Sequence, residues 1–252
     1  MATTSRPYHH GDLRAALVEE ALGLARTEGP TGVSLREATR RVGVTPSAAY
    51  RHFRDRSHLL DAVARQVQER MAERMRESME AAEGTSPAEQ SLQRLRGVGT
   101  GYIDFALEEP GWFETGFFAA LREEDPAAGG ARSGAADGPR ASAADGGGQA
   151  DGGGQAAPGD DALPDDGASP SDGTAGPSAG VPPFVLLMAA LDDCVETGVL
   201  PAARRPGAEF VCWSAVHGFA ELVLHGPLAG VDRRMVRQLA RRVVDDAITG
   251  IR

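Results

Sequence analysis

The chain has 252 residues, which is more than one average domain and enough to bury a sizeable core, and its formal net charge is −10. Its two cysteines, Cys194 and Cys212, are too few for a disulfide framework, and no run approaches the roughly 18 apolar residues of a membrane span. The polar start lacks the apolar segment of a signal peptide, so we expect a cytoplasmic protein that is neither secreted nor membrane-bound.

The negative total does not exclude a nucleic-acid partner, because the charge is unevenly placed. Residues 1–65 hold ten Arg against seven Asp or Glu, whereas residues 125–182 hold nine Asp against two Arg. All 26 basic side chains are Arg, so any contact with a phosphate is made by a guanidinium group. The N-terminal surface can therefore be basic although the chain is acidic.

The first part of the chain predicts three helices. Residues 12–29 form an apolar stripe at helical spacing, with Asp12 as the cap and Gly29-Pro30 as the end. Ser34-Leu35-Arg36-Glu37 is typical of a capping box, in which the Ser hydroxyl and the Glu carboxylate bind free amides of a short helix that ends near Gly43. Pro46 suits the first turn of another short helix, which ends around Phe53.

Longer helices follow. One begins near Ser57 and repeats an apolar residue every fourth position, at Val63, Val67, Met71, Met75 and Met79. Ser86-Pro87-Ala88-Glu89 is a second capping box and opens a helix to about residue 108. Pro110 opens a helix rich in aromatic residues, and further helices are expected at 183–198, 206–225 and 232–249, the last with a stripe through Met235, Leu239, Val243 and Ala247.

The composition changes abruptly in residues 125–182, where no aromatic residue occurs and the only large aliphatic ones are Leu163 and Val181. Such a segment cannot bury enough apolar surface to offset its ordering entropy, so we expect a disordered acidic insertion. Closing a long loop costs little more than closing a short one, so the flanking helices can share one domain. A passive spacer and an interaction module are both open, and the composition favours the spacer.

The two short helices at 35–42 and 46–53, joined by Val42-Gly43-Val44-Thr45, match the helix-turn-helix pattern. The second helix of such a motif enters a major groove about 12 Å wide, so its exposed face needs small and polar residues. Thr45, Ser47 and Ala48 are of this kind. An ordinary helical hairpin would have the same spacing, so the pattern alone leaves both interpretations open.

The segment from Ser34 to Leu60, which includes Tyr50-Arg51-His52-Phe53-Arg54-Asp55-Arg56, resembles the DNA-binding domain of tetracycline-repressor (TetR) type regulators. The match covers about residues 10–65. The resemblance implies an all-α fold, with a helix-turn-helix domain at 10–58 and a helical ligand-binding and dimerisation domain at 59–252. It also implies that Arg36, Thr45, Ser47 and Tyr50 touch bases or nearby phosphates, and that Arg56 stands where the family usually has Lys.

The residues themselves add phosphate contacts to this set. The capped helix start at Ser34 can point amides at a phosphate, and Arg54 and Arg56 suit phosphate clamping. His52 is expected to be packed or bonded to a phosphate rather than to read a base. Because Ala48 and Ala49 are small, direct base contacts are expected to be few. The predicted DNA-binding set is Ser34, Arg36, Thr45, Pro46, Ser47, Tyr50, Arg51, His52, Arg54 and Arg56.

Towards the C-terminus, Trp213-Ser214-Ala215-Val216-His217-Gly218 resembles the signature of a C-terminal subclass called the WHG type. The family then implies a divergent ligand pocket and a homodimer formed by the last two helices. Ten of the thirteen aromatic residues lie between Tyr102 and Phe219, which supports a small-molecule pocket, although core packing explains any one of them. The predicted pocket residues are Tyr102, Phe105, Trp112, Phe117, Met188, Trp213 and His217, and a largely apolar effector is expected.

We expect a homodimeric repressor that a small molecule releases from a pseudo-palindromic double-stranded DNA operator. A DNA-binding activator and a ligand-independent regulator remain alternatives. An enzyme is not expected, because there is no Ser-His-Asp set and the Gly-rich stretch at 146–154 lacks the flanks of a nucleotide loop. No cofactor is expected. His217, Glu221 and His225 have the spacing of metal ligands on one helical face, but a pocket or dimer face is the preferred interpretation.

Overall fold

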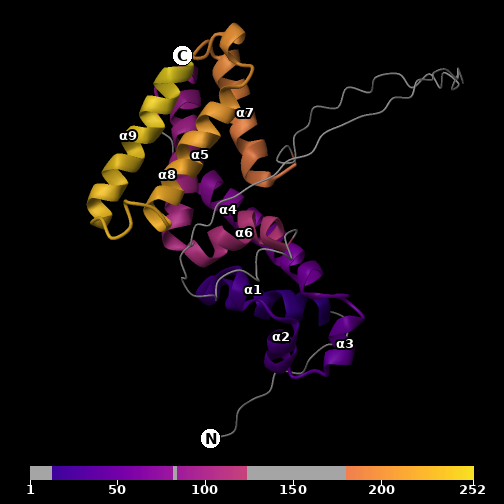
Figure 1. The fold of residues 1–252 in the computed structure, drawn as a ribbon. Coiled ribbons are helices and arrows are strands. Elements are labelled where there is room, and N and C mark those ends of the chain that lie inside the picture. The colour runs from indigo at the N-terminus through magenta and orange to yellow at the C-terminus, as the bar shows by residue number, and fades with distance from the viewer. Residues whose placement is uncertain (1–12, 82–83, 124–179) are drawn as a thin grey trace, which may run out of the picture. The chain divides into compact units, whose positions relative to one another are not determined.

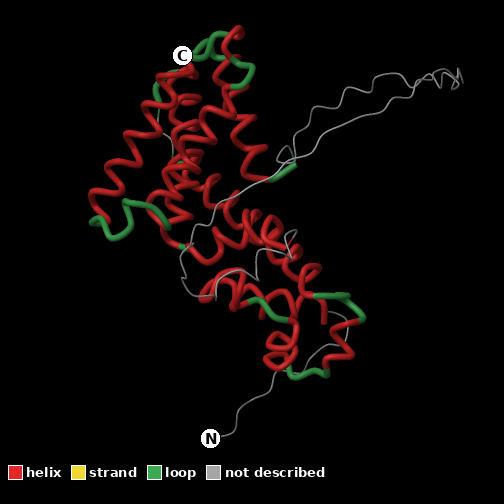
Figure 2. The backbone as a smooth tube through the Cα atoms, in the orientation of Figure 1, coloured by secondary structure: helices red, strands yellow, loops and turns green. Residues whose placement is uncertain are grey.

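The computed structural model describes residues 13–81, 84–123 and 180–252, and for residues 118–123 it describes the backbone alone. These residues form nine α-helices and one short 3₁₀ turn. Figure 2 shows that the described backbone consists of helices and loops, without a strand. The predicted all-α class is therefore confirmed. Asp12 and almost all of the expected insertion at 125–182 lie outside the described residues.

The N-terminal end consists of α1 (Leu13–Gly32), α2 (Leu35–Val42) and α3 (Pro46–Tyr50). Helix α1 is broken at Gly29, whose φ of 65° and ψ of −163° are not helical, which agrees with the expected end there. Gly43 adopts a left-handed conformation with φ of 80° and ends α2. Its N–H and that of Val44 both donate to the carbonyl of Thr39, at 3.0 and 3.1 Å. This compact end makes the sharp turn that the motif requires.

Only half of the first predicted capping box forms. The Ser34 hydroxyl accepts a hydrogen bond from the N–H of Glu37, at 3.4 Å. The Glu37 carboxylate was expected to return to the start of the helix, but it binds Arg40 and Arg41 instead. Two guanidinium groups within one turn outcompete a single backbone amide for the carboxylate.

Helices α4 (Arg56–Glu80) and α5 (Pro87–Glu108) form the central pair of the larger domain. Asp55 caps α4 by accepting from the N–H of His58 at 2.8 Å. The two backbones lie unusually close, because a Cβ added at Gly97 would stand 2.6 Å from the carbonyl oxygen of Ser78. A Cβ at Gly101 would stand 2.8 Å from the Cα of Met75. The glycines of α5 are therefore what allows this contact.

The remaining helices are α6 (Pro110–Glu123), α7 (Pro182–Glu196), α8 (Ala208–Leu224) and α9 (Arg233–Ile251), with the 3₁₀ turn at Ala202–Arg204. In Figure 1, α8 and α9 pack against each other and against α5. The core face of α9 consists of Val236, Ala240, Val244 and Ile248. The predicted stripe starting at Met235 is wrong by one position, because apolar residues occupy two adjacent rows and only the packing decides which one is buried.

Candidate nucleic-acid interface and ligand site

One face of the helix-turn-helix is exposed and chemically suited to a groove. Thr45, Pro46, Ser47 and Tyr50 are all exposed, and Tyr50 is 58% accessible. Ala49 and Phe53, on the opposite side of the same segment, are fully buried. One side of the segment is thus packed into the domain and the other faces solvent. The four predicted DNA-binding residues named above lie on the solvent-facing side.

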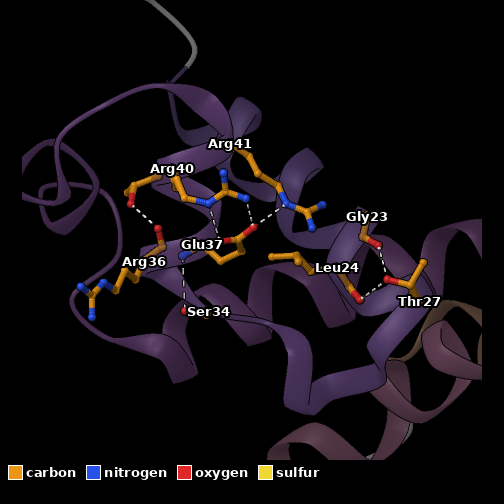
Figure 3. Close-up of polar contacts among 9 residues, drawn as sticks. Gly23, Leu24, Thr27, Ser34, Arg36, Glu37, Arg40 and Arg41 are labelled. Carbon is orange, nitrogen blue, oxygen red and sulfur yellow. Dashed lines mark hydrogen bonds and ion pairs between the residues drawn. The ribbon is translucent and has the colours of Figure 1, made fainter.

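The arginines of α2 differ in their freedom. Figure 3 shows the Glu37 carboxylate between the guanidinium groups of Arg40 and Arg41, while the side chain of Arg36 extends away from them. Arg40 binds both carboxylate oxygens, at 2.8 and 2.6 Å, and Arg41 binds one at 3.0 Å. The hydrogen bonds from Arg40 and then Arg41 lower the pKa of Glu37 to about 2. Arg36 is therefore the arginine of α2 that Glu37 does not neutralise.

Other predicted residues flank this surface. Arg51 is exposed just after α3, and His52 is half-buried beside it. The Arg54 side chain is 83% exposed, and its Nε lies 3.0 Å from Asp55. The hydroxyl of Ser34 already binds the N–H of Glu37, so Ser34 acts first as a helix cap. An incoming phosphate would meet Arg51 and Arg54 more readily than Ser34.

Arg56 binds the backbone of its own domain. Its Nε donates to the carbonyl of Val33 at 2.7 Å, and an Nη donates to the carbonyl of Pro30 at 2.5 Å. These carbonyls follow the break in α1, so Arg56 joins the start of α4 to the end of α1. The sequence suggested a phosphate clamp, but the structure aims the guanidinium of Arg56 at the backbone of its own domain.

A cluster of six rings occupies the larger domain, and we call it the aromatic cluster. Ring centroids lie 5.1 Å apart for Tyr102 and Trp213, and 5.7 Å apart for Phe117 and His217. Four of its members are predicted pocket residues. The cluster comprises Tyr102, Phe113, Phe117, Phe184, Trp213 and His217, contributed by α5, α6, α7 and α8.

The polar groups of this cluster pair with each other. The hydroxyl of Tyr102 and Nδ1 of His217 are 2.6 Å apart. Burial, followed by the negative charge of Glu221, raises the pKa of Tyr102 well above its usual value. Burial lowers the pKa of His217, against the smaller opposing effect of Glu221. At neutral pH both side chains are therefore uncharged.

The other predicted pocket residues lie elsewhere. Trp112 stacks on Phe105, with 6.4 Å between centroids, and its indole N–H donates to the carbonyl of Leu22 at 2.8 Å. The guanidinium groups of Arg26 and Arg70 lie 5.0 and 4.9 Å from its ring centroid. Met188 is half-buried on α7, where its carbonyl faces Arg205 at 3.5 Å.

Sequence reasoning missed Phe113 and Phe184 as neighbours of the cluster. A shift of one residue turns the side chain by about 100° around the helix axis, so α6 sends Phe113 inwards and Trp112 towards α1. The aromatic count signalled a cluster, but it could not sort the rings between these two places.

Beside the cluster lies an apolar cavity of about 20 Å³. Tyr102 and Trp213 line it, together with Met75, Leu187, Val216 and Ile248 among others. This space holds roughly one water molecule. The residues that would surround a ligand thus fill most of the site themselves.

Helix α6 connects this region to the helix-turn-helix. Arg26 of α1 binds both carboxylate oxygens of Glu109, at 2.6 and 2.5 Å. A Cβ at Gly111 would stand 2.5 Å from the carbonyl oxygens of Ala25 and Arg26. Trp112 thus reaches α1 from the same helix that contributes Phe113 and Phe117 to the aromatic cluster.

The residues considered as metal ligands have other partners. His225 lies between two carboxylates, with Nε2 2.7 Å from Glu114 and Nδ1 3.0 Å from Glu221. The hydrogen bond with Glu114 is the largest cause of a raised pKa at His225. This bridge joins α6 to the end of α8.

Comparison with known proteins agrees with this architecture. Residues 17–63 match the model for bacterial regulatory proteins of the tetR family, and residues 155–247 match the model for the tetracyclin repressor-like C-terminal domain. Together the two matches cover more than half of the chain. None of the curated proteins matches it.

Solved structures share the fold at low sequence identity. A protein of unknown function from Rhodococcus sp. RHA1 is 22% identical, with 98% of each chain covered and a TM-score of 0.61. A candidate regulatory protein, SCO4313, is 17% identical, with 98% of this chain and 100% of that chain covered and a TM-score of 0.53.

In the described part of the chain, no helix is both long and apolar enough to cross a membrane. The exposed face of the helix-turn-helix, the two matched domains and the shared fold lead to one assignment. The chain belongs to the TetR family and is a DNA-binding transcriptional regulator.

Proposed function

We propose that the protein is a homodimeric repressor, and that a small molecule bound in the aromatic cluster releases it from a pseudo-palindromic operator. In this proposal residues 10–58 bind DNA, residues 59–252 bind the ligand and dimerise, and segment 125–182 is a spacer. DNA is contacted by Arg36, Thr45, Pro46, Ser47, Tyr50, Arg51 and Arg54.

The observation that carries the proposal is the double attachment of α6. Phe113 and Phe117 belong to the aromatic cluster, while Trp112 of the same helix and Glu109, which lies just before that helix, bind α1. A ligand that enters the cluster displaces rings of α6, and the Arg26 and Leu22 contacts transmit that displacement to the DNA-binding domain. The ligand acts by its different affinity for the two arrangements.

The proposed dimer face is the outer side of α8 and α9. Val211, Leu222 and Met235 are 50, 45 and 49% exposed, although all three are apolar. Gly218 lies on the same helix as the first two, with open space where a Cβ would be. An apolar surface of this kind suits a second copy, since the symmetry of a dimer places two recognition helices one helical turn of DNA apart.

The dimer face is tested by Leu222→Arg combined with Met235→Arg. We expect sedimentation to show monomers and operator affinity to fall at least tenfold. Val185→Arg is the matched control, because Val185 is equally exposed at 48% but lies on α7. A double variant that stays dimeric would place the interface elsewhere.

Operator recognition is tested by incubating the purified protein with sheared genomic DNA at two salt concentrations and sequencing what is retained. Recovery of a short inverted repeat supports a dimeric regulator, and the neighbouring genes then suggest effectors for release assays. Retention without sequence preference, and with strong salt dependence, would count against operator-specific repression.

A ligand-independent regulator is the second candidate, and the small volume of the cavity favours it. If the six rings only pack the core, Phe117→Ala creates a cavity and destabilises the protein without a change in any ligand response. Release of the operator by a small molecule, abolished in this variant, would exclude that candidate.

A further inference from the structure

Glu221 has a buried carboxylate oxygen that no donor reaches in the described part of the chain. Its Oε2 is hydrogen-bonded to Nδ1 of His225, whereas Oε1 is buried without a partner. A buried carboxylate oxygen that gives up water without gaining a donor costs folding free energy. This cost is recovered when a donor arrives from outside the chain.

Glu221 lies close to two members of the aromatic cluster, His217 and Tyr102. Glu221 follows His217 by one helical turn on α8, so the two share a face. Its charge acts on both Tyr102 and His217, as their shifted pKa values record. Its Oε2 is bound by His225, whereas Oε1 is the buried oxygen.

The cluster itself is suited to a cation. Aromatic faces attract positive charge, most strongly where water is excluded, and Tyr102 and Trp213 are the strongest such rings present. The hydroxyl of Tyr102 and the ring of His217 are uncharged at neutral pH. The negative charge next to these rings is that of Glu221.

We infer that the effector is a lipophilic amine, whose protonated nitrogen donates to Oε1 of Glu221 while its hydrocarbon part packs among the rings of the aromatic cluster. This assignment rests on the proposed function, because it takes the cluster as the effector site. A neutral hydrocarbon would leave Oε1 without a donor, and an anion would be repelled by Glu221. The cavity beside Tyr102 and Trp213 gives the hydrocarbon part a place to extend once the rings move apart.

The test compares ligands of equal shape and different charge on the full-length protein. Benzyldimethylamine, protonated at pH 7, is paired with its carbon isostere isobutylbenzene, and each is extended to homologues with two and three rings. Tryptophan fluorescence and thermal unfolding measure binding. We expect the amines to bind roughly tenfold or more tightly than the matched hydrocarbons, as a charged hydrogen bond warrants.

Two variants separate the buried oxygen from the ion pair around it. Glu221→Gln removes the charge at Oε1 and is expected to abolish the preference for amines. Glu114→Gln removes the other carboxylate that holds His225 but leaves Glu221 in place, so the preference should stay within about twofold of wild type. Circular dichroism and thermal unfolding verify that Glu221→Gln is folded.

Each result decides the matter. Equal binding of amine and hydrocarbon, failure of every amine to bind, or an unchanged preference in Glu221→Gln overturns the inference. If hydrocarbons bind and release the operator, the proposed function stands without a cationic effector. If amines bind through Glu221 but never release the operator, the site stands and the proposed release is wrong.

Discussion

Within the helix-turn-helix, side chains with similar chemistry have different tasks, and the difference depends on what lies near them. Arg36 and Arg56 are both arginines in sequence positions associated with DNA contact. Arg36 extends from α2 away from Glu37, whereas Arg56 binds the carbonyls of Val33 and Pro30. The sequence could not reveal the second case, because its partners lie more than twenty residues earlier in the chain.

Tyr50→Ala tests the exposed face. Because Tyr50 is 58% exposed, the loss of its ring should change the thermal unfolding midpoint little. Specific operator binding should weaken by about 1 kcal/mol or more, the magnitude of one good base contact. Fluorescence anisotropy with operator and scrambled DNA measures this loss, and equal affinity of variant and wild type for the operator would remove Tyr50 from the interface.

Arg56→Ala and Arg54→Ala form a matched pair. Loss of two hydrogen bonds from a guanidinium group to buried carbonyls should cost Arg56→Ala roughly 2–4 kcal/mol of unfolding free energy. Arg54→Ala should leave stability unchanged and lower the slope of log affinity against log salt by roughly 0.9. Chemical denaturation and salt titrations distinguish the two. If Arg56→Ala were as stable as wild type and lowered the salt slope, Arg56 would contact a phosphate as the sequence predicts.

At the level of helices, the boundaries could largely be predicted, because they depend on local chemistry. Ser34 and Ser86 cap α2 and α5, and Gly43 ends α2 as expected. Face choice was less predictable: the row from Met235 and the row from Val236 are both apolar, and contact with α5 and α8 decides between them. The same limit explains why Trp112 and Phe113, adjacent in sequence, serve different sites.

The close approach of α4 and α5 predicts a stability effect at Gly101. Gly101→Ala places a Cβ against the Cα of Met75, so the helices must separate, at a cost of roughly 1–3 kcal/mol. Gly23→Ala is the control, because its Cβ meets open space within α1 and should stabilise the helix by roughly 0.5–1 kcal/mol. Urea denaturation compares them, and equal midpoints would mean that α4 and α5 separate freely.

The bridge between α6 and α8 predicts a dependence of stability on pH. Glu114 first, and then Glu221, raise the pKa of His225 in the folded state. The stabilisation by His225 is therefore fully present below its unfolded value of about 6.5 and is lost as the pH rises through the raised folded value. The wild type should exceed His225→Gln in unfolding midpoint near pH 6, and the two should converge towards pH 9.

Both wild type and His225→Gln retain His217, whose contribution to stability changes with pH in the opposite direction. Subtracting their unfolding midpoints cancels this contribution. Because the pKa of His217 is lowered in the folded state, its contribution to stability is present above the pKa of the unfolded chain and is lost as the pH falls. A constant offset between wild type and His225→Gln across this range would show that the bridge is not charged.

For the whole molecule, the glycine contact between α4 and α5 has a mechanical consequence. The glycines hold α5 against the C-terminal part of α4, around Met75 and Ser78, while Arg56 at the other end of α4 binds the carbonyls of Val33 and Pro30. If α4 tilts about a point near Met75, its start at Arg56 moves most, because it lies about 28 Å away along the helix at 1.5 Å per residue. A tilt of about 5° would move the start of α4 by about 2.4 Å. This displacement is larger than the variation in donor–acceptor distance that a hydrogen bond tolerates. A rotation too small to disturb the core could thus withdraw a recognition helix from its bases.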